Sequence, residues 1–236
     1  MLLTSLFHTI TEAEKDDAVE DIIRRATPRK DFFVMLVLSV SMATFGVLLG
    51  STVILVGSML IAPLLYPLLS LSLGIILVDE KLIARSLYTI GKSMLFGLAA
   101  GLLIGFLFSG HHLSTTTLFN NSQEGSASLM YAIVAAIAGF AAAFAMSKPH
   151  LNETLPGVAI SVALVPPLAT AGVALSLLDW SGFSSALLLF MVNIIGIVFS
   201  AMIVFALMQF SAKTRVAEKV EQIEDRVIEK ESISIS

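Results

Sequence analysis

Six long apolar stretches dominate this chain, and each is about as long as a helix must be to cross a lipid bilayer. A transmembrane helix needs about 20 consecutive, mostly apolar residues. The six stretches cover residues 32–49, 52–78, 86–108, 128–146, 154–178 and 184–210. Only 14% of the 236 residues are charged, against about 25% in soluble domains. The sequence therefore predicts an all-α polytopic membrane protein with a six-helix transmembrane domain at residues 32–210 and the lipid bilayer as a partner.

The basic residues fall on alternate connections between these stretches. Thirteen of the 14 Lys and Arg residues lie in the segments 1–31, 79–85, 147–153 and 211–236. The intervening connections 50–51, 109–127 and 179–183 contain none. Because cytoplasmic loops are enriched in Lys and Arg, this alternation predicts six crossings of an integral membrane protein, with both termini in the cytoplasm and residues 109–127 as an outer loop.

The two terminal segments carry helical patterns. Thr11 and Glu14 fit a capping box that opens an amphipathic helix running to about Ala26 within the cytoplasmic segment 1–31. The charged tail, residues 211–236, has apolar residues at a spacing of four, three and four. These are Val216, Val220, Ile223 and Val227. Such a seam is short for a coiled coil, but subunits already associated in the membrane could form it, so we expect a homo-oligomer.

Two of the apolar stretches are interrupted by proline near their middles. The second contains Pro63 and Pro67, and the fifth contains Pro166 and Pro167. Proline removes a backbone donor and clashes with the preceding turn, so a helix kinks or breaks there. Irregular backbone at membrane depth is tolerated only where protein or a water-filled cavity receives it. We therefore predict that helices two and five are broken, although two ordinary proline kinks would give the same pattern.

The two proline segments lie in opposite orientations, because the predicted topology has three crossings in each half. This indicates two inverted three-helix repeats, residues 32–108 and 128–210, an arrangement found in many transporters. Asp79 follows the second stretch as Asp179 follows the fifth, which extends the correspondence. The alternative is a chance similarity between two helices rich in Leu, Val and Ala.

The proline breaks are the candidate substrate site. A half-helix that starts at mid-membrane presents free N–H groups and partial positive charge, which attract anions. Lys92 is the only charge within a span and is a functional candidate, unless it snorkels to the interface. Asn193 either lines the site or bonds between helices. The candidate residues are Ser58, Pro63, Tyr66, Pro67, Ser70, Lys92, Ser161, Pro166, Pro167, Thr170 and Asn193.

Several classes of function are disfavoured by what the chain lacks. No Asp or Glu lies in the core of a span, which disfavours a proton or sodium relay and favours an anionic or neutral solute. We find no catalytic spacing and expect neither an enzyme nor a cofactor. His111 and His112 have no spaced third ligand, so no metal site is expected. The net charge of −4 argues against a nucleic-acid partner.

Stripes of small residues indicate close helix packing. Gly97, Gly101 and Gly105 recur every fourth residue in the third stretch, as Ala135, Gly139 and Ala143 do in the fourth. Small residues let helix backbones approach each other in a membrane. We assign these stripes to packing rather than to ligand binding.

The two proline motifs resemble the signatures of an uncharacterised hydrophobic-domain family of prokaryotic membrane proteins, domain of unknown function 389. The first motif runs from Gly57 to Pro67 and is followed by Asp79 and Arg85. The second runs from Leu155 to Gly172 and is followed by Asp179, Trp180 and Asn193. The resemblance covers about residues 30–210. It implies a bacterial or archaeal membrane protein, and hence the cytoplasmic (inner) membrane, but supplies no substrate or catalytic residue.

Together these patterns predict a membrane transport protein that moves a small anionic or neutral solute through a mid-membrane site. Two other classes remain open from the sequence. The tail seam and the lack of coupling carboxylates also fit an oligomeric channel or pore. The cytoplasmic helices also fit a membrane scaffold that transports nothing.

Overall fold

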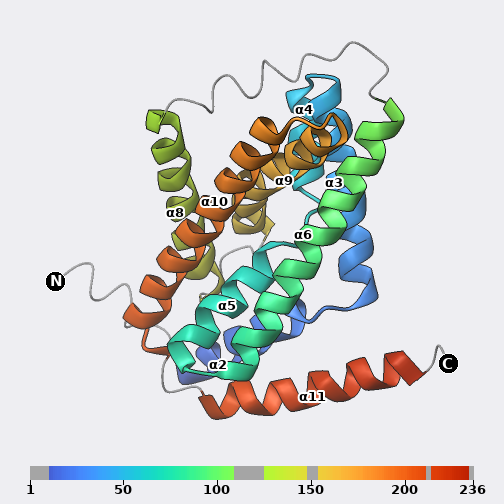
Figure 1. Ribbon diagram of the computed structural model, residues 1–236. Helices are drawn as coiled ribbons and strands as arrows, with labels where there is room; N and C mark the ends of the chain where they lie inside the picture. Colours follow the sequence, from blue (N-terminus) through green and yellow to red (C-terminus); the bar gives the residue numbers. More distant parts are fainter. Residues whose placement is uncertain (1–10, 109–124, 148–153, 211–213, 234–236) are drawn as a thin grey trace.

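The computed structural model describes residues 11–108, 125–147, 154–210 and 214–233, and these residues form an all-helical fold (Figure 1). The helices of the described residues are α2 (Glu12–Ala26), α3 (Lys30–Leu48), α4 (Thr52–Met59), α5 (Leu65–Leu77), α6 (Glu80–Phe108), α8 (Gly125–Met146), α9 (Thr154–Ser176), α10 (Trp180–Leu207) and α11 (Thr214–Ile233). His111, His112 and most of the predicted outer loop 109–127 lie outside the described residues.

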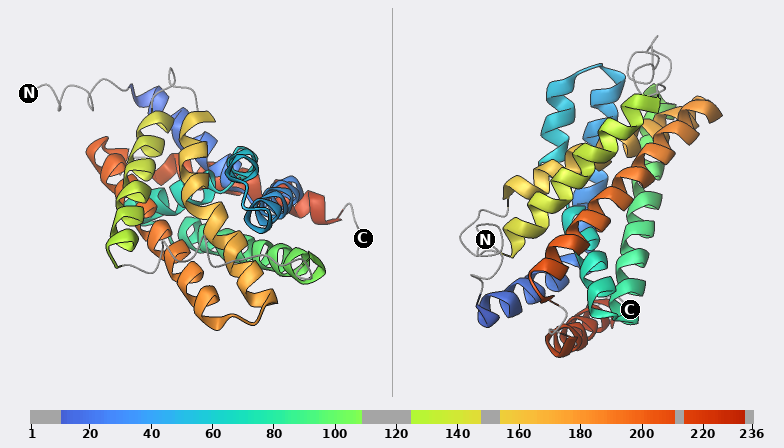
Figure 2. Two further views of the ribbon diagram at one scale, coloured as in Figure 1. Left: turned by 90° about the horizontal axis from the view of Figure 1, so that it is seen from above. Right: turned by 90° about the vertical axis from the view of Figure 1, so that its left-hand side faces the viewer.

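Three of these helices, α3, α6 and α10, are long and apolar enough to cross a membrane. They form a bundle with α4, α5, α8 and α9 (Figures 1 and 2). Helices α2 and α11 contact each other and lie at one end of the bundle, where the turn between α5 and α6 is also found (Figure 1). The membrane character expected from composition therefore has a structural counterpart in these helices.

Helix α2 begins as the capping box predicts. The backbone N–H of Thr11 donates to Glu14 Oε2 at 2.7 Å, and the N–H of Glu14 donates to Thr11 Oγ1 at 3.3 Å. Val19, Ile22 and Ile23 on its apolar face are almost fully buried. Helix α2 contacts α5 and α11, so this face packs on the protein itself rather than lying on a membrane surface.

The break predicted in the second apolar stretch is confirmed. Helix α4 ends at Met59 and α5 begins at Leu65, and residues 60–64 between them are not helical. Pro63 lies in this interruption, and Pro67 lies in the first turn of α5, where its missing N–H costs no helical hydrogen bond.

The break predicted in the fifth stretch is wrong. Helix α9 runs without interruption through Pro166 and Pro167. Pro167 cannot donate to the carbonyl four residues earlier, that of Ala163, which is left without its helical partner. Asn193 on α10 replaces it, because its Nδ2 donates to the Ala163 oxygen at 2.6 Å. A neighbouring helix thus supplies the hydrogen bond that proline removes, and the site expected from two broken helices has one broken and one continuous helix.

The small-residue stripes pack as predicted. A Cβ atom added to Gly172 of α9 would lie 2.7 Å from the Cα of Gly101 on α6, so the two backbones touch. On the other side of the bundle, a Cβ added to Gly139 of α8 would lie 2.5 Å from the carbonyl oxygen of Ile197 on α10. The glycines therefore set the spacing of the α6–α9 and α8–α10 pairs.

Two turns in the chain share one backbone design. Val78 and Leu178 both adopt the left-handed conformation, with φ of 55° and 57°. The N–H of Asp79 donates to the Gly74 oxygen and that of Asp179 to the Ala174 oxygen, both at 2.9 Å. Each Asp then accepts backbone N–H groups in the first turn of the following helix. These turns end α5 and α9 and start α6 and α10.

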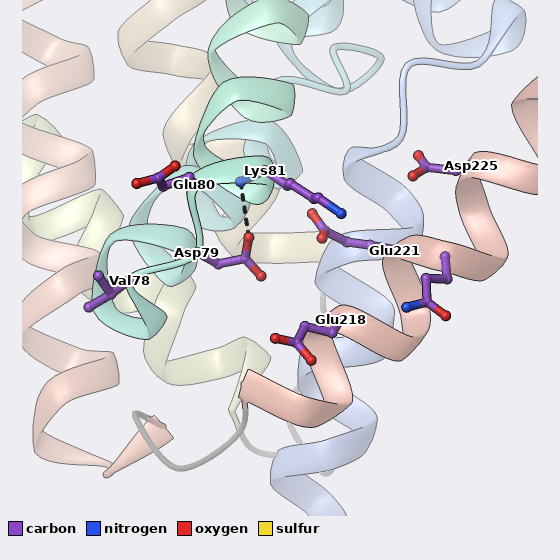
Figure 3. Close-up of a pocket in the computed structure, with 8 residues that line it drawn as sticks. Val78, Asp79, Glu80, Lys81, Glu218, Glu221 and Asp225 are labelled. Atoms are coloured by element: carbon purple, nitrogen blue, oxygen red, sulfur yellow. Dashed lines mark hydrogen bonds between the residues drawn. The ribbon is translucent and has the colours of Figure 1, made fainter.

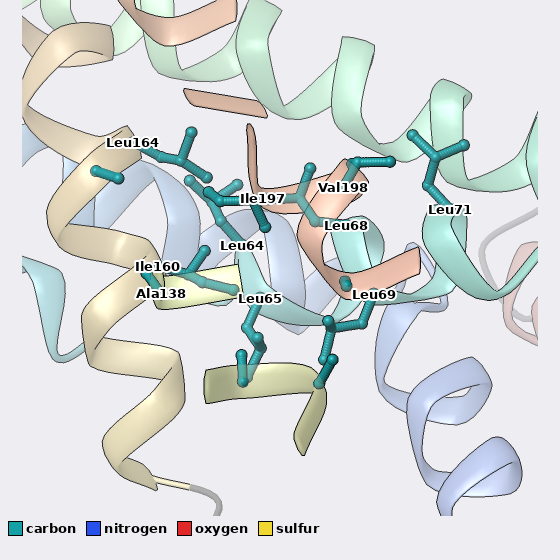
Figure 4. Packing of buried hydrophobic residues seen from close by; sticks show 14 of the residues in the cluster. Leu64, Leu65, Leu68, Leu69, Leu71, Ala138, Ile160, Leu164, Ile197 and Val198 are labelled. Carbon is teal, nitrogen blue, oxygen red and sulfur yellow. The ribbon is translucent and has the colours of Figure 1, made fainter. Parts of the chain in front are cut away.

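Apolar side chains fill the space where α5 packs against α9 and α10 (Figure 4). Leu64, Leu65 and Leu68, at the start of α5, are at most 4% exposed. Ile160 and Leu164 of α9 and Ile197 and Val198 of α10 belong to the same buried cluster. The side chains at the start of α5 are therefore held by an apolar contact just after the helix interruption.

Helix α11 confirms the helical tail, but only part of the predicted seam is buried. Val220 is 8% exposed, whereas Ile223 is 52% exposed. The buried residues of α11 also include Ala217, Glu221 and Glu224. The face that docks on the protein is thus rotated from the predicted seam toward two carboxylates.

Candidate functional site

Serine hydroxyls of α3 and of α4 itself donate hydrogen bonds to carbonyl groups just before the α4–α5 interruption. Ser39 Oγ of α3 donates to the Ser58 oxygen at 2.8 Å, and Ser58 Oγ donates to the Leu55 oxygen at 2.6 Å. Both serines are fully buried. Buried backbone carbonyls without partners would be costly, so these hydroxyls stabilise irregular backbone inside the bundle.

The two proline segments meet at this interruption. Ser161 of α9 donates from its hydroxyl to the carbonyl oxygen of Ala62 at 3.3 Å. Ala62 immediately precedes Pro63, and Ser161 lies five residues before Pro166. Helices α4 and α9 also contact each other. The structure thus joins Ser161 of the second proline segment to the residue that precedes Pro63 in the first.

Asn193 joins this region from α10 and has hydrogen-bonding capacity left over. Its side chain is 1% exposed, and its Nδ2 bonds the Ala163 oxygen two residues after Ser161. Its Oδ1 is buried and has no hydrogen-bond partner among the described residues. Buried amide oxygens normally have a partner, so this atom can accept a hydrogen bond from water or from a bound solute.

The first turn of α5, which follows the interruption, has no side-chain cap. Leu64, the N-cap residue, makes no side-chain capping bond. The backbone N–H groups that open a helix have no partner within it and carry partial positive charge. The helix N-terminus therefore favours hydrogen-bond acceptors, whereas the Asn193 oxygen favours donors.

Three other predicted site residues make hydrogen bonds within their own helix or with α2 and α6. Thr170 Oγ1 donates to the Pro166 oxygen of its own helix at 2.6 Å. Ser70 accepts from Ser86 Oγ of α6 at 2.9 Å. The Tyr66 hydroxyl accepts from Arg25 Nη1 of α2 at 2.7 Å. These contacts tie helices to one another or to their own backbone.

Lys92 lies among aromatic side chains on the outside of α6. Its Nζ is 4.7 Å from the centroid of the Phe33 ring, 5.5 Å from that of Tyr88 and 6.0 Å from that of Phe96. Tyr88 and Phe96 are exposed. The ammonium is therefore held by cation–π contacts at the periphery of the bundle, away from the proline crossing.

Sequence reasoning missed Ser39 of α3, which donates to the Ser58 carbonyl, and Arg25 of α2, which donates to the Tyr66 hydroxyl. Neither has a signal of its own in the sequence, because a serine in an apolar helix and an arginine in an amphipathic helix are both common. Only the packing of α3 against α4 and of α2 against α5 gives them a role. Among the residues that the structure describes, no group of three or more His, Cys, Asp or Glu side chains is placed to hold a metal ion.

The fold and the site define an all-α protein with the apolar helices of a membrane protein and a proline-interrupted helix inside its bundle. Comparison with known proteins is consistent with this class. The family model described as a domain of unknown function (DUF389) matches residues 59–199, and the chain belongs to this family.

One relative is an uncharacterised protein of the archaeon Methanocaldococcus jannaschii. It is 30% identical over 214 residues, which cover 86% of this chain and 65% of the relative. The chain thus spans less than two thirds of the relative's length. No solved structure matches the chain.

Proposed function

We propose that this protein is a six-crossing membrane transport protein for a small anionic or neutral solute. The six crossings would be α3, the α4–α5 pair, α6, α8, α9 and α10. Beyond the three long apolar helices, α8 has 22 residues and α9 has 23, enough for about 30 Å of helix each. Helices α4 and α5 would cross together as one interrupted span.

The proposed membrane is the prokaryotic cytoplasmic (inner) membrane, with both termini in the cytoplasm. Support comes from the end of the bundle where α2, α11 and the α5–α6 turn gather (Figure 1). The basic residues Arg24, Arg25, Arg29, Lys81 and Arg85 all belong to these elements or their links. The positive-inside rule assigns such an end to the cytoplasm.

The proposed architecture is two inverted repeats. Three features support it: the matching left-handed turns at Val78 and Leu178, the capping roles of Asp79 and Asp179, and the cross-packing of α6 on α9 and of α10 on α5. Each repeat would then contribute one proline segment to the centre, with sites at the repeat interface as in other transporters.

The observation that carries the proposal is the hydrogen bond from Ser161 to the Ala62 carbonyl, which joins the two proline segments inside the bundle. With the buried Asn193 oxygen, it defines a polar point among apolar helices. Such points in membrane proteins mark substrate pathways. Neither a cofactor nor a catalytic step is part of the proposal, and homo-oligomers would carry one site in each chain.

The test is solute uptake by proteoliposomes, with neutral polar solutes and small anions followed by light scattering, together with thermal unfolding of the purified protein against the same panel. A solute that binds the folded protein raises its stability by about 2.7 kcal/mol at a hundredfold excess over Kd. Asn193→Ala should remove both the uptake and the thermal shift. Ser184→Ala, which alters an exposed serine of the same helix, should change neither.

The other outcomes point elsewhere. Single-channel conductance across a planar bilayer would indicate that the protein is a pore rather than a carrier. No flux and no thermal shift across the panel would reject transport and favour a scaffold that acts through α2 and α11.

A further inference from the structure

A cavity of about 360 Å³ lies between α11 and the turn from α5 to α6. Its wall is mainly acidic (Figure 3). The lining residues are Val78, Asp79, Glu80, Lys81, Glu218, Glu221, Gln222 and Asp225. None of the predicted transport-site residues belongs to it.

Glu221 is the most buried carboxyl group of this lining. Its side chain is 5% exposed, and its Oε1 has no hydrogen-bond partner among the described residues. Asp79, on the opposite wall, is 9% exposed and uses Oδ1 to accept the N–H groups of Lys81 and Leu82. Docking α11 therefore carries one carboxyl group out of water toward another carboxylate, which is costly when both are charged.

Helix α11 also makes ion pairs with the bundle. Arg29, in the link from α2 to α3, bonds Glu224 at 2.7 Å. Arg85 of α6 bonds Asp225 at 3.2 Å and Thr27 Oγ1 at 2.8 Å. These pairs hold α11 on the bundle and leave Glu221 as the carboxyl group whose charge opposes docking.

The charged groups that act on Glu221 come from three places. Asp79 belongs to the α5–α6 turn, Lys81 and Arg85 to α6, and Asp225 to α11 itself. Helix α2 also contacts α11; on α2, Lys15 pairs with Glu12, and Arg24 and Arg25 pair with Asp21. Burial first, and then the Asp79 charge, raise the pKa of Glu221 from 4.5 to about 7.

We propose that Glu221 is a proton-binding switch that determines whether α11 lies on the bundle. With the proton bound, the carboxyl group is neutral and α11 docks beside Asp79. Without it, the buried charge and its neighbour Asp79 favour release of α11 into water. If the protein is the transporter proposed above, release of α11 uncovers the cytoplasmic end of the bundle, but the docking switch itself does not depend on transport.

The direction of the pH dependence follows from the two states. The docked carboxyl binds its proton more tightly than the solvated one, so docking is strongest in acid. It weakens as pH rises from about 4.5 to about 7 and then levels off. With solvent screening at this cavity taken into account, we expect the docking equilibrium to change by about tenfold to a hundredfold over this range.

The experiment measures the position of α11 directly. The chain contains no cysteine, so Ile223→Cys on the exposed face of α11 and Ala84→Cys on the exposed face of α6 give one pair of spin labels in the otherwise native protein. At about pH 5, electron–electron distance measurements should give one narrow distribution, and at about pH 8 a second, broader population should appear.

Three charge-removing variants separate the switch from general charge effects. Glu221→Gln keeps the shape of the side chain without its charge, and it should hold the narrow distribution at both pH values. Glu218→Gln, at an exposed position of the same cavity, should retain the transition. Asp79→Asn keeps a good helix cap and should weaken the transition, because docked Glu221 then ionises without an adjacent negative charge and its charge opposes docking less.

A wild-type protein whose distribution is the same at both pH values would overturn the proposal. So would a transition that survives in Glu221→Gln. Because each variant reports its distances at both pH values, loss of folding would appear as a broad distribution at acid pH, where the switch requires a narrow one.

Discussion

The bond between Asn193 and the Ala163 carbonyl should be strong only because Pro167 is present. In the wild-type chain, the Ala163 oxygen has lost its helical donor to proline and accepts Asn193 Nδ2 at 2.6 Å. Asn193→Leu removes this donor and fills nearly the same space with an apolar side chain. The carbonyl would then be buried without a partner, inside a helix that already lacks the bond from residue 167.

The expected cost can be worked from these groups. Leaving one buried carbonyl unpaired costs about 1–3 kcal/mol in soluble proteins, and side-chain hydrogen bonds inside membranes average about 0.6 kcal/mol with a maximum near 1.7. Asn193→Leu also removes the unpartnered Asn193 oxygen, which offsets part of this loss of stability. We expect Asn193→Leu to lower the free energy of unfolding by about 1 kcal/mol.

A double-mutant cycle tests the cause. Pro167→Ala restores a backbone N–H that can donate to the Ala163 oxygen, so Asn193→Leu should cost almost nothing in that background. Pro166→Ala restores the donor for residue 162 instead, and it should leave the cost of Asn193→Leu unchanged. The coupling energy is therefore about 1 kcal/mol for Pro167 and close to zero for Pro166.

The assay is reversible unfolding of the purified protein in mixed micelles of increasing denaturing detergent, followed by circular dichroism. Four proteins close each cycle, and both cycles share the wild type and Asn193→Leu. Additive effects for Pro167 and Asn193, within about 0.3–0.5 kcal/mol, would refute the account of why α9 stays continuous. Equal coupling to both prolines would also refute it, because only one of them frees the Ala163 carbonyl.

Three further changes test the packing by the same unfolding assay. Gly172→Ala should destabilise the bundle by about 2 kcal/mol, because its Cβ would lie 2.7 Å from the backbone of α6. The control Gly91→Ala meets nothing within 4 Å and should be neutral or stabilising. Equal effects of the two substitutions would contradict the close approach of α6 and α9. Val78→Gly should stabilise by about 0.5–1 kcal/mol by relieving a left-handed valine at φ of 55°, and a loss of stability would count against that strain. Arg29→Met should cost about 1–2 kcal/mol, since it leaves the 4% exposed Glu224 without its 2.7 Å partner; an unchanged midpoint would mean that the pair is not formed.

The two proline segments show which parts of this fold can be predicted from the sequence and which cannot. Pro63 and Pro67 predict the interruption between α4 and α5 correctly, because two donors are lost within five residues and the chain leaves the helix there. Pro166 and Pro167 make the same local argument, yet α9 continues. The deciding group is Asn193, which lies 26 residues beyond Pro167 and on another helix. The positions of the prolines identify the carbonyls that lose their helical donors. Packing against other helices determines whether those carbonyls find another hydrogen-bond donor.

Features that depend on neighbours in sequence were predictable, and features that depend on partners were not. The capping box of α2 and the spacing of the glycine stripes follow from local chemistry and are found as expected. The docking face of α11 is different, since the carboxylates Glu221 and Glu224 are buried while Ile223 is exposed. An amphipathic pattern identifies the apolar side of a helix, but ion pairs with another element can rotate that helix.

The hydrogen-bond partners of these residues also limit the chemical class of the proposed solute. A hydroxyl has one hydrogen to donate, and the hydrogens of Ser58, Ser161 and Thr170 are directed at backbone carbonyls. The polar residues that the sequence marks as ligands therefore serve first to support the helix interruption and the proline helix. What remains for a solute is the Asn193 oxygen, an acceptor, and the N–H groups in the first turn of α5, which are donors. A solute with its own N–H or O–H groups satisfies both, whereas a simple anion satisfies only the second. Neutral polar solutes should therefore rank ahead of simple anions in the thermal panel, and the reverse order would mean that the Asn193 oxygen takes no part in binding.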